Sequence, residues 1–318
     1  MRMSFFHRSK ETEGWRAVSF NGHDALAAHV QRPSSGNPIV SMIASQPMDG
    51  ATPTEVLARL TRSWQGQKHA CTTAVKAGSY EFLPVDAPNV LAAELKSAIA
   101  WTVTSMTDLT KEESTIEVLS VPYDKTVAQR ARAMYAVVIR TRLASDIQRC
   151  FQDAKLSLKV IDVPEMAQRN VAGLLETEGR ALALVSFDAD GGLLTFSSSG
   201  ELFLARRIAV TAQQLLEGGP ELREQHQETV ALEIQRSLDH FGRQFSWVGL
   251  AELVVAPIGD DDGGLVAYLG ANLDTQVAAL DLATILDISY VPELKSLRIQ
   301  QKYFMALGLA LRHEEKVL

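Results

Sequence analysis

The sequence has few cysteines, and their spacing fits neither a disulfide-linked scaffold nor a metal site. Cys71 and Cys150 are the only two, and neither belongs to a CxxC pair or a cysteine–histidine cluster. Disulfide scaffolds and structural zinc sites both need several such residues at short spacing. We therefore expect two reduced, buried thiols in a protein of a reducing compartment, the cytoplasm.

Long apolar runs are also absent, as is an excess of positive charge. No stretch approaches the roughly 18 uncharged apolar residues that a membrane-spanning helix needs. The basic start of the chain, Met1 to Lys10, leads into no apolar run of a secretory signal. The formal net charge is −7, whereas nucleic-acid binding requires a basic surface. These absences predict a cytoplasmic protein without a membrane span and without a nucleic-acid partner.

Three catalytic motifs are missing as well. The sequence contains no GxxxxGK[ST], no GxSxG and no HExxH. It therefore lacks the phosphate loop of P-loop motors, the nucleophile elbow of α/β-hydrolases and the zinc helix of metalloproteases. The seven histidines show no other metal-ligand spacing. We expect no catalytic residue and no metal site.

What the sequence does contain is the composition of a packed globular protein. Of its 318 residues, 46% are hydrophobic and 22% are charged, which is typical of folded domains. This length suggests two domains or one two-lobed unit. Strand and helix patterns alternate, which predicts an α/β fold. In the first part of the chain the patterns predict a hairpin at 15–30, strands at 37–44, 80–85, 115–121, 134–139 and 158–163, and helices at 53–64, 142–154 and 164–172.

A long helix is predicted between the strands at 80–85 and 115–121. Asn89 would cap this helix, and its buried face would carry Leu91, Leu95, Ile99 and Val103 at intervals of four residues.

A second unit is predicted to open at about residue 180. The Gly/Asp and Ser/Gly turns at 188–192 and 198–200 separate apolar runs, as in a meander of antiparallel strands. The expected elements are strands at 181–188, 193–197, 201–210, 250–256 and 275–280, and helices at 222–241, 264–273 and 297–313.

Five segments, in this order along the chain, carry a resemblance to one known family. They are Ala87-Pro-Asn-Val90, Ile161-Asp-Val-Pro-Glu-Met-Ala-Gln-Arg-Asn170, Gly200-Glu-Leu-Phe-Leu-Ala-Arg-Arg-Ile208, Leu232-Glu-Ile-Gln-Arg-Ser-Leu-Asp-His-Phe241 and Ala306-Leu-Gly-Leu-Ala-Leu-Arg312. Together they resemble the PilM family of actin-like pilus assembly proteins. The resemblance covers the chain from about residue 70 to its end. It is strongest to the branch that serves mannose-sensitive haemagglutinin (MSHA) pili.

The resemblance implies an actin-like (ribonuclease H-like) fold of two lobes, each a mixed sheet flanked by helices. The first lobe would comprise residues 1–178, completed by the C-terminal helix 297–318, and the second lobe residues 179–296. The resemblance also implies a protein that lies at the inner membrane through its partners. These would be the cytoplasmic peptide of a bitopic PilN-like membrane protein and other pilus platform proteins, and homodimerisation stays open. The helix at 91–104 and the strand at 115–121 are the predicted wall of the peptide cleft.

The archetype of this family holds ATP and Mg²⁺ between its lobes, at two hairpin turns. Each turn needs an acidic residue near the metal, and glycine so that backbone N–H groups can approach phosphate. The first turn here is Arg16-Ala-Val-Ser-Phe-Asn-Gly22, with Ser19 or Phe20 at the expected acidic position. The carboxylate that would hold Mg²⁺ is therefore missing from this turn.

The second turn keeps more of the pattern. Asp188 and Asp190 could approach a hydrated cation, and Gly191 and Gly192 a phosphate, which makes these four the candidate cofactor-binding residues. A plain hairpin explains the same residues, because Asp and Gly are common in turns.

The adenosine-side turn of the family, a strand followed by Gly-Gly, is altered too. Val254-Val255 precede Ala256-Pro257, and proline has no N–H to offer. The following Asp260-Asp-Asp-Gly-Gly264 brings three like charges. We therefore expect a pseudo-ATPase scaffold that needs no cofactor, although ATP with Mg²⁺ stays open. The alternatives are an active ATPase in which Asp188 holds Mg²⁺, and a relative of the L component of type II secretion.

Overall fold

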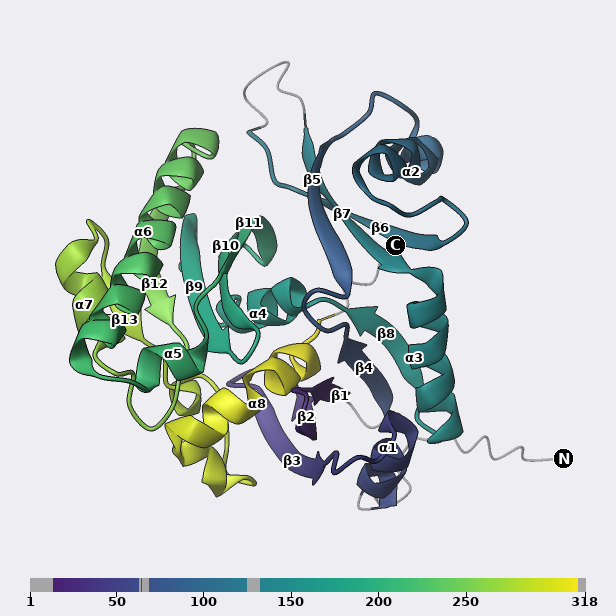
Figure 1. The fold of residues 1–318 in the computed structure, drawn as a ribbon, viewed down its shortest axis with the longest axis horizontal. Coiled ribbons are helices and arrows are strands. Elements are labelled where there is room, and N and C mark those ends of the chain that lie inside the picture. Colours follow the sequence, from purple (N-terminus) through teal and green to yellow (C-terminus); the bar gives the residue numbers. More distant parts are fainter. Residues whose placement is uncertain (1–13, 63, 65–68, 125–131, 314–318) are drawn as a thin grey trace, which may run out of the picture.

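The computed structural model describes residues 14–62, 64, 69–124 and 132–313. In these ranges the strands form three sheets (Figure 1). The first sheet has the strand order β3-β2-β1-β4-β8, in which β1, β2 and β3 are antiparallel neighbours and β4 and β8 run parallel to β1. Its strands are β1 (Trp15–Phe20), β2 (Asp24–Gln31), β3 (Ile39–Pro47), β4 (Ala70–Ala74) and β8 (Leu158–Asp162).

Two helices cover one face of the first sheet. They are α1 (Pro53–Arg62) and α3 (Thr141–Asp153). Leu57 of α1 and Phe151 of α3 pack with Val18 of β1 in one buried cluster. α1 is amphipathic, and all three of its buried residues lie on this face.

The second sheet has the order β11-β10-β9-β12-β13. β9, β10 and β11 form the antiparallel meander, while β12 and β13 add in parallel. Three helices pack on its outer face in one apolar cluster. The strands are β9 (Arg180–Asp188), β10 (Gly191–Ser198), β11 (Glu201–Ile208), β12 (Gly249–Val255) and β13 (Val277–Ala279), and the helices are α5 (Ala212–Leu216), α6 (Pro220–Gln244) and α7 (Leu265–Asn272).

Two helices lie between the large sheets and join them. α4 (Pro164–Ala172) and α8 (Leu297–Ala310) share a buried cluster with residues of both sheets, among them Leu26 of β2 and Leu184 of β9. The short 3-10 helices η2 (Leu282–Thr284) and η3 (Pro292–Lys295) lead into α8. Because α4 also connects the first sheet to the second along the chain, this helix pair forms the junction between the two sheet-bearing lobes.

A third, smaller sheet is inserted in the first lobe, with the order β5-β7-β6. Its strands are β5 (Tyr80–Asp86), β6 (Ser114–Ser120) and β7 (Ala133–Arg140). α2 (Leu95–Met106), preceded by η1 (Ala92–Glu94), covers one face. Residues of the other face pack with the second sheet, where the Tyr135 hydroxyl donates to the carbonyl of Phe203 at 3.4 Å. The insertion therefore touches both lobes.

Most predicted elements are present, but one strand of the first lobe was missed and two expectations about its long helix are wrong. β4 was not predicted, because the short run Ala70–Ala74 is weakly apolar although it forms a central strand. Asn89 does not cap the long helix, since α2 begins at Leu95 with Glu94 at its N-cap. Leu91 therefore lies before the helix and is 73% exposed instead of buried. Within the described ranges, no helix is long and apolar enough to cross a membrane.

Candidate functional site

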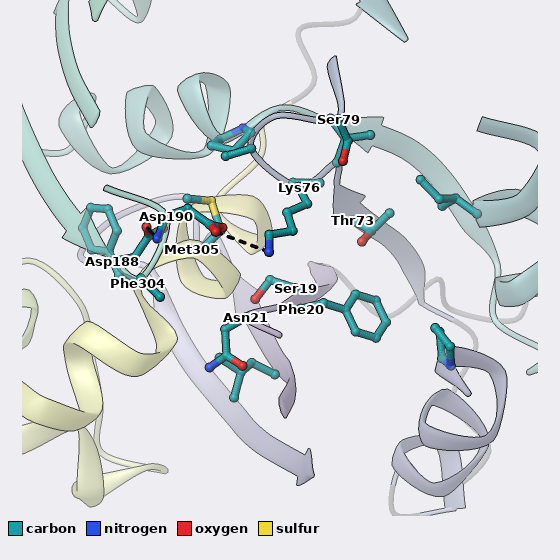
Figure 2. Close-up of a pocket in the computed structure, with 18 of the residues that line it drawn as sticks. Ser19, Phe20, Asn21, Thr73, Lys76, Ser79, Asp188, Asp190, Phe304 and Met305 are labelled. Carbon is teal, nitrogen blue, oxygen red and sulfur yellow. Dashed lines mark hydrogen bonds and ion pairs between the residues drawn. The ribbon is translucent and has the colours of Figure 1, made fainter. Parts of the chain in front are cut away.

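A cavity of about 450 Å³ lies where the two lobes face each other (Figure 2). The end of β1, the chain that follows β4, the β9–β10 hairpin and α8 all contribute to its lining. This is the position between two lobes at which nucleotide turns were predicted. Residues labelled in Figure 2 that line it are Ser19, Phe20, Asn21, Thr73, Lys76, Ser79, Asp188, Asp190, Phe304 and Met305.

The first hairpin turn caps its own backbone. The Asn21 side-chain oxygen accepts from the N–H groups of His23 at 3.1 Å and Asp24 at 2.7 Å. The turn also closes through a backbone bond from Asn21 to Asp24. These amides are the kind that would bind a phosphate, and a side chain of the same turn already occupies them. The Asn21-Gly22 pair is the sequence signal for the hairpin predicted at 15–30, which the structure contains, but the bonds from its own backbone to the Asn21 side chain were not predicted.

The second hairpin behaves in a similar way. The Asp188 carboxylate accepts from the Asp190 N–H at 2.7 Å. Desolvation by burial raises the pKa of Asp188, whereas the hydrogen bond from the Asp190 N–H opposes that rise and the Asp190 charge adds to it. Asp190 in turn forms an ion pair with Lys76 of the first lobe at 3.3 Å. An ammonium group therefore lies beside the carboxylate that could otherwise approach a metal.

The two predicted glycines have a packing role in this hairpin. Gly191 and Gly192 are both buried and are not part of the cavity lining. A Cβ on Gly191, whose φ is +121°, would come within 2.8 Å of the Ile208 carbonyl oxygen, and a Cβ on Gly192 within 2.7 Å of the Phe187 ring. Of the four candidate cofactor-binding residues, the structure brings Asp188 and Asp190 to the cavity. The glycines allow β10 to approach β11 and the Phe187 ring.

The third loop follows β12 and caps itself as well. Pro257 is buried and lines the cavity. Asp261 accepts from the Gly263 N–H at 2.7 Å, and Asp262 accepts from Gly264 at 3.0 Å and from Val266 at 2.9 Å. The carboxylate of Asp262 thus occupies the N-terminus of α7, which is where an anion would bind. The acidic run is therefore a capping element of α7.

All three loops consequently satisfy backbone amides with oxygens of their own side chains. Asp188 and Asp190 are the residues placed to meet a hydrated cation, but no group of three or more His, Cys, Asp or Glu side chains in the described ranges could hold a metal. The backbone N–H groups of these loops already have hydrogen-bond partners within the protein. A charged ligand would have to displace those partners.

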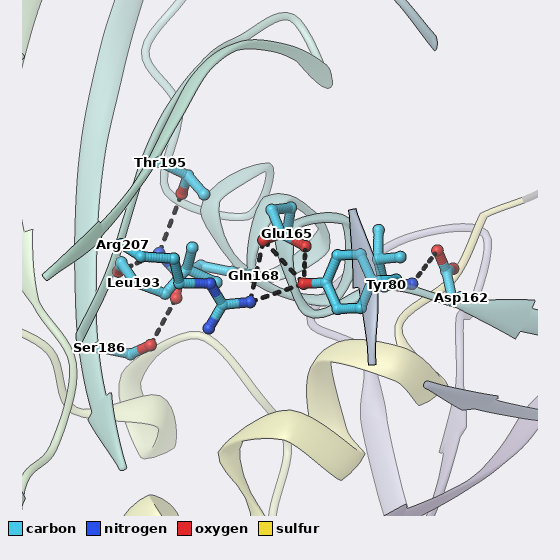
Figure 3. Close-up of polar contacts among 9 residues, drawn as sticks. Tyr80, Asp162, Glu165, Gln168, Ser186, Leu193, Thr195 and Arg207 are labelled. Carbon is cyan, nitrogen blue, oxygen red and sulfur yellow. Dashed lines mark hydrogen bonds and ion pairs between the residues drawn. The ribbon is translucent and has the colours of Figure 1, made fainter. Parts of the chain in front are cut away.

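A polar network beside the cavity connects three elements of both lobes (Figure 3). Glu165 at the start of α4 is 3% exposed, and it accepts from the Tyr80 hydroxyl at 2.7 and 2.9 Å and from Arg207 at 2.9 Å. Arg207 also donates to the Tyr80 hydroxyl at 2.7 Å. Burial opposes the Arg207 charge, but Glu165 and Tyr80 together raise the pKa of Arg207 above its ordinary value. The network ties β5, α4 and β11 together.

One turn further along α4, Gln168 fixes the helix to the second sheet. Its side-chain nitrogen donates to the carbonyls of Leu184 at 2.7 Å and Leu193 at 3.0 Å and to the Thr195 hydroxyl at 3.0 Å. Its side-chain oxygen accepts from the Ser186 hydroxyl at 2.5 Å. Every polar atom of this fully buried amide therefore has a partner, which holds α4 in one position.

A second cavity, of about 440 Å³, lies in the first lobe between β8 and the third sheet. β8 is the edge strand of the first sheet, and β6 and β7 form the opposite wall. The groove is mostly apolar, and a buried ion pair lies at its end, where Arg312 donates to Asp162 at 2.6 Å. Burial raises the pKa of Asp162, and Arg312 opposes that rise. Apolar residues of the lining include Val75, Leu119, Val137, Ile139, Ala144, Val160, Ile161 and Met166.

This groove matches half of the predicted peptide cleft. The strand predicted at 115–121 lines it as part of β6. No described residue of the 91–104 helix does, because α2 covers the opposite face of the third sheet. The part of the helix in a peptide cleft therefore stays a prediction. The strand predicted at 158–163 is present as β8, but its place at the edge of the sheet had no sequence signal.

Comparisons with known proteins identify the fold. No protein-family model and no curated protein matches the sequence. Two sheet-bearing lobes around a cleft define an actin-like fold. Among solved structures, the chain is similar to one titled "PilM-PilN type IV pilus biogenesis complex", with a TM-score of 0.71 and 17% identity over 95% of this chain and 98% of that chain.

Two further similarities are weaker. The cytoplasmic domain of EpsL, an inner membrane component of the type II secretion system of Vibrio cholerae, gives a TM-score of 0.42 at 14% identity, over 64% of this chain and 73% of that chain. A Bacteroides thetaiotaomicron protein with an actin-like ATPase fold gives a TM-score of 0.45 at 11% identity, over 92% of this chain and 99% of that chain. The actin-like architecture, predicted as two lobes with mixed sheets and flanking helices, is confirmed.

Proposed function

We propose that this chain is a scaffold of a type IV pilus assembly platform of the MSHA type, equivalent to the biogenesis protein MshI. It would bind the cytoplasmic tail of a bitopic PilN-like membrane protein and lie in the cytoplasm against the inner membrane through that partner. The resemblance of five sequence segments to the PilM family supports this proposal, as does the similarity to the PilM of the PilM-PilN complex.

The observation that carries the proposal is the groove between β8 and the third sheet. An edge strand offers backbone groups to an extended peptide, and apolar walls provide pockets for its side chains. Glu117 and Lys159 line the groove beside the Asp162–Arg312 pair. These features fit a peptide with apolar anchors flanked by charge.

The proposed scaffold does not turn over ATP. In the turn after β1, in the β9–β10 hairpin and in the loop after β12, backbone N–H groups bond to an oxygen of Asn21, Asp188, Asp261 or Asp262, and of these N–H groups the one of Asp190 belongs to the cavity lining. The first turn carries Ser19 or Phe20 at the position where the family has a carboxylate. A second candidate function, an ATP-dependent switch, is favoured by the presence of Asp188 and Asp190 in the cavity lining.

Titration of the full chain with synthetic peptides tests the scaffold proposal. The peptides would carry the cytoplasmic tails of candidate bitopic proteins from pilus and type II secretion platforms. We expect micromolar binding of a pilus tail, and a loss of at least tenfold in Ala144→Trp, whose indole would fill the groove from α3. Ser145→Trp is the matched control, because the neighbouring Ser145 is exposed and does not line the groove.

Two results would contradict the proposal. Binding of secretion tails in preference to every pilus tail would assign the chain to the type II secretion platform. Equal binding by the two tryptophan variants would show that the peptide site lies elsewhere.

A further inference from the structure

The interlobe cavity has two chemically different halves. Ser19 and Phe20 are neighbours in β1, and Figure 2 draws their side chains toward different parts of the cavity. Ser19 lies on the side of Lys76 and the β9–β10 hairpin. Phe20 belongs to the more apolar half. α1 and α3 complete this half with Pro53, Leu143, Ile147, Cys150 and Phe151, and Thr54 and Asp146 are its polar members.

Ser19 is a buried polar residue without a protein partner. It is 6% exposed and lines the cavity. Its hydroxyl has no side-chain hydrogen bond to any residue in the described ranges, whereas the nearby Thr73 hydroxyl donates to the Val18 carbonyl at 2.8 Å. The Ser19 Oγ is not enclosed by protein atoms but faces the cavity. Its hydrogen bond is therefore available to a molecule that binds there.

The charges of the cavity do not favour a phosphate as that partner. Lys76 pairs with Asp190, Arg207 with Glu165, and Lys302 with Asp24 at 2.9 Å. Every lysine and arginine in the lining, within the described part of the chain, thus has an acidic partner. A phosphate would have to compete for these cations and for the Asp190 N–H, which already bonds the Asp188 carboxylate.

We propose that the interlobe cavity binds a small uncharged molecule with an apolar body and a single hydrogen-bonding group. The body would lie between α1 and α3, and the polar group would bond to the Ser19 hydroxyl. A cavity of about 450 Å³ falls within the range of small-molecule sites, which are mostly apolar with few polar groups. The proposal goes beyond the scaffold function and does not depend on it.

A pair of probes that differ by one hydroxyl group tests this proposal. Equilibrium dialysis of the full chain with naphthalene and with 2-naphthol should give binding of both, with 2-naphthol tighter. Ser19→Ala should weaken 2-naphthol by three- to tenfold, the size expected for one hydrogen bond, and leave naphthalene unchanged. A change of equal size for both probes would contradict the assigned role of Ser19.

The reactivity of the cysteine thiols shows whether the probes bind in the apolar half of the cavity. Cys150 is half-buried, lines the apolar half and accepts from Thr54 at 3.3 Å, whereas Cys71 is 1% exposed. A bound probe should therefore slow the reaction of a thiol reagent with Cys150. Cys150→Phe, or Leu143→Trp if the first variant folds poorly, should fill the apolar half and abolish binding of both probes.

Trp101→Ala is the control for adsorption to exposed apolar surface, because Trp101 is 73% exposed on α2. This variant should keep both affinities. The proposal is overturned if neither probe binds up to its solubility limit. It is also overturned if Mg-ATP displaces both probes, since the cavity would then be a nucleotide site.

Discussion

Gly308 of α8 lies directly against Ala167 of α4, so closely that a Cβ at residue 308 would overlap the Ala167 carbonyl oxygen. At the same crossing, Asn170 donates to the Gly308 carbonyl at 2.9 Å. The two helices that join the large sheets therefore meet backbone to backbone. This contact explains the glycine in the segment Ala306 to Arg312 through which the sequence resembles the PilM family.

Gly308→Ala should destabilise the protein by about 2–3 kcal/mol, because the backbones at this crossing must separate to admit a methyl group. Gly270→Ala is the matched control: Gly270 also lies inside a helix, α7, but a Cβ there would have no neighbour within 4 Å. That change should be neutral or stabilise by up to about 1 kcal/mol through helix propensity. Urea unfolding measures both, and equal effects would rule out the close crossing.

Arg207→Gln should lower the free energy of unfolding by about 2 kcal/mol, because it leaves the buried Glu165 carboxylate without its cation. The Arg207 side chain is partly exposed to solvent. The loss of stability is therefore smaller than for a fully buried ion pair. Arg206→Gln changes a neighbouring exposed arginine and should cost less than about 0.5 kcal/mol.

Tyr80→Phe should cost about 1 kcal/mol, and a double-mutant cycle with Arg207→Gln should reveal coupling, since the two side chains bond each other and Glu165. Urea unfolding of the single and double variants gives the coupling energy. Strict additivity would mean that the three groups do not act as one network.

The stability of the protein should fall as the pH drops from about 6.5 to about 4, partly because of His29. Burial first, and then the neighbouring His69 and Arg16, lower the pKa of His29 to about 4. In the unfolded chain this histidine binds a proton with its ordinary pKa of 6.5. The folded state therefore loses stability as the pH falls from about 6.5 to about 4, by up to roughly 3 kcal/mol. Above pH 6.5 this histidine is neutral in both states and contributes no pH dependence.

His29→Gln tests that assignment. Glutamine can keep a hydrogen bond to the Ser41 hydroxyl, which lies 2.5 Å from His29 Nδ1, and it does not titrate. Unfolding free energies of the variant should therefore decline less steeply between pH 6.5 and 4 than those of the unsubstituted protein. Parallel curves would show that other groups govern the acid sensitivity.

Calorimetric titration with Mg-ATP, with ADP as a second ligand, should give no binding heat at millimolar nucleotide. The Asp190 N–H of the cavity lining already bonds the Asp188 carboxylate, and Lys76 pairs with Asp190. Asp188→Ala should accordingly change nothing in this assay. Micromolar binding that Asp188→Ala abolishes would support the ATP-dependent switch instead.

Much of the fold follows from sequence patterns, because long elements keep their periodicity. The meander at 181–210 and the stripe of Val56, Leu57 and Leu60 in α1 are examples. The strand β4 is different, since Ala70–Ala74 is short and its burial comes from neighbouring strands that pair with it from distant parts of the chain. The position of α2 also depends on packing against β5 and β7, which the Asn89 capping pattern could not reveal.

The sequence predicts which residue types occur in the turns of the candidate site, but it does not predict where their side chains point. The acidic and glycine-rich turns are visible in the sequence, and Asp188 and Asp190 do line the cavity. Whether a turn residue faces a ligand or caps its own backbone depends on side-chain rotation, which sequence spacing does not specify. Asn21 and Asp262 therefore gained their role from the structure.

The loops that bond their own backbone have a consequence for how the protein would respond to cellular nucleotide levels. On the proposed scaffold function, a cleft whose amides are bonded internally would not respond to the ratio of ATP to ADP. The proposed scaffold would then hold its partner equally well at high and at low cellular energy.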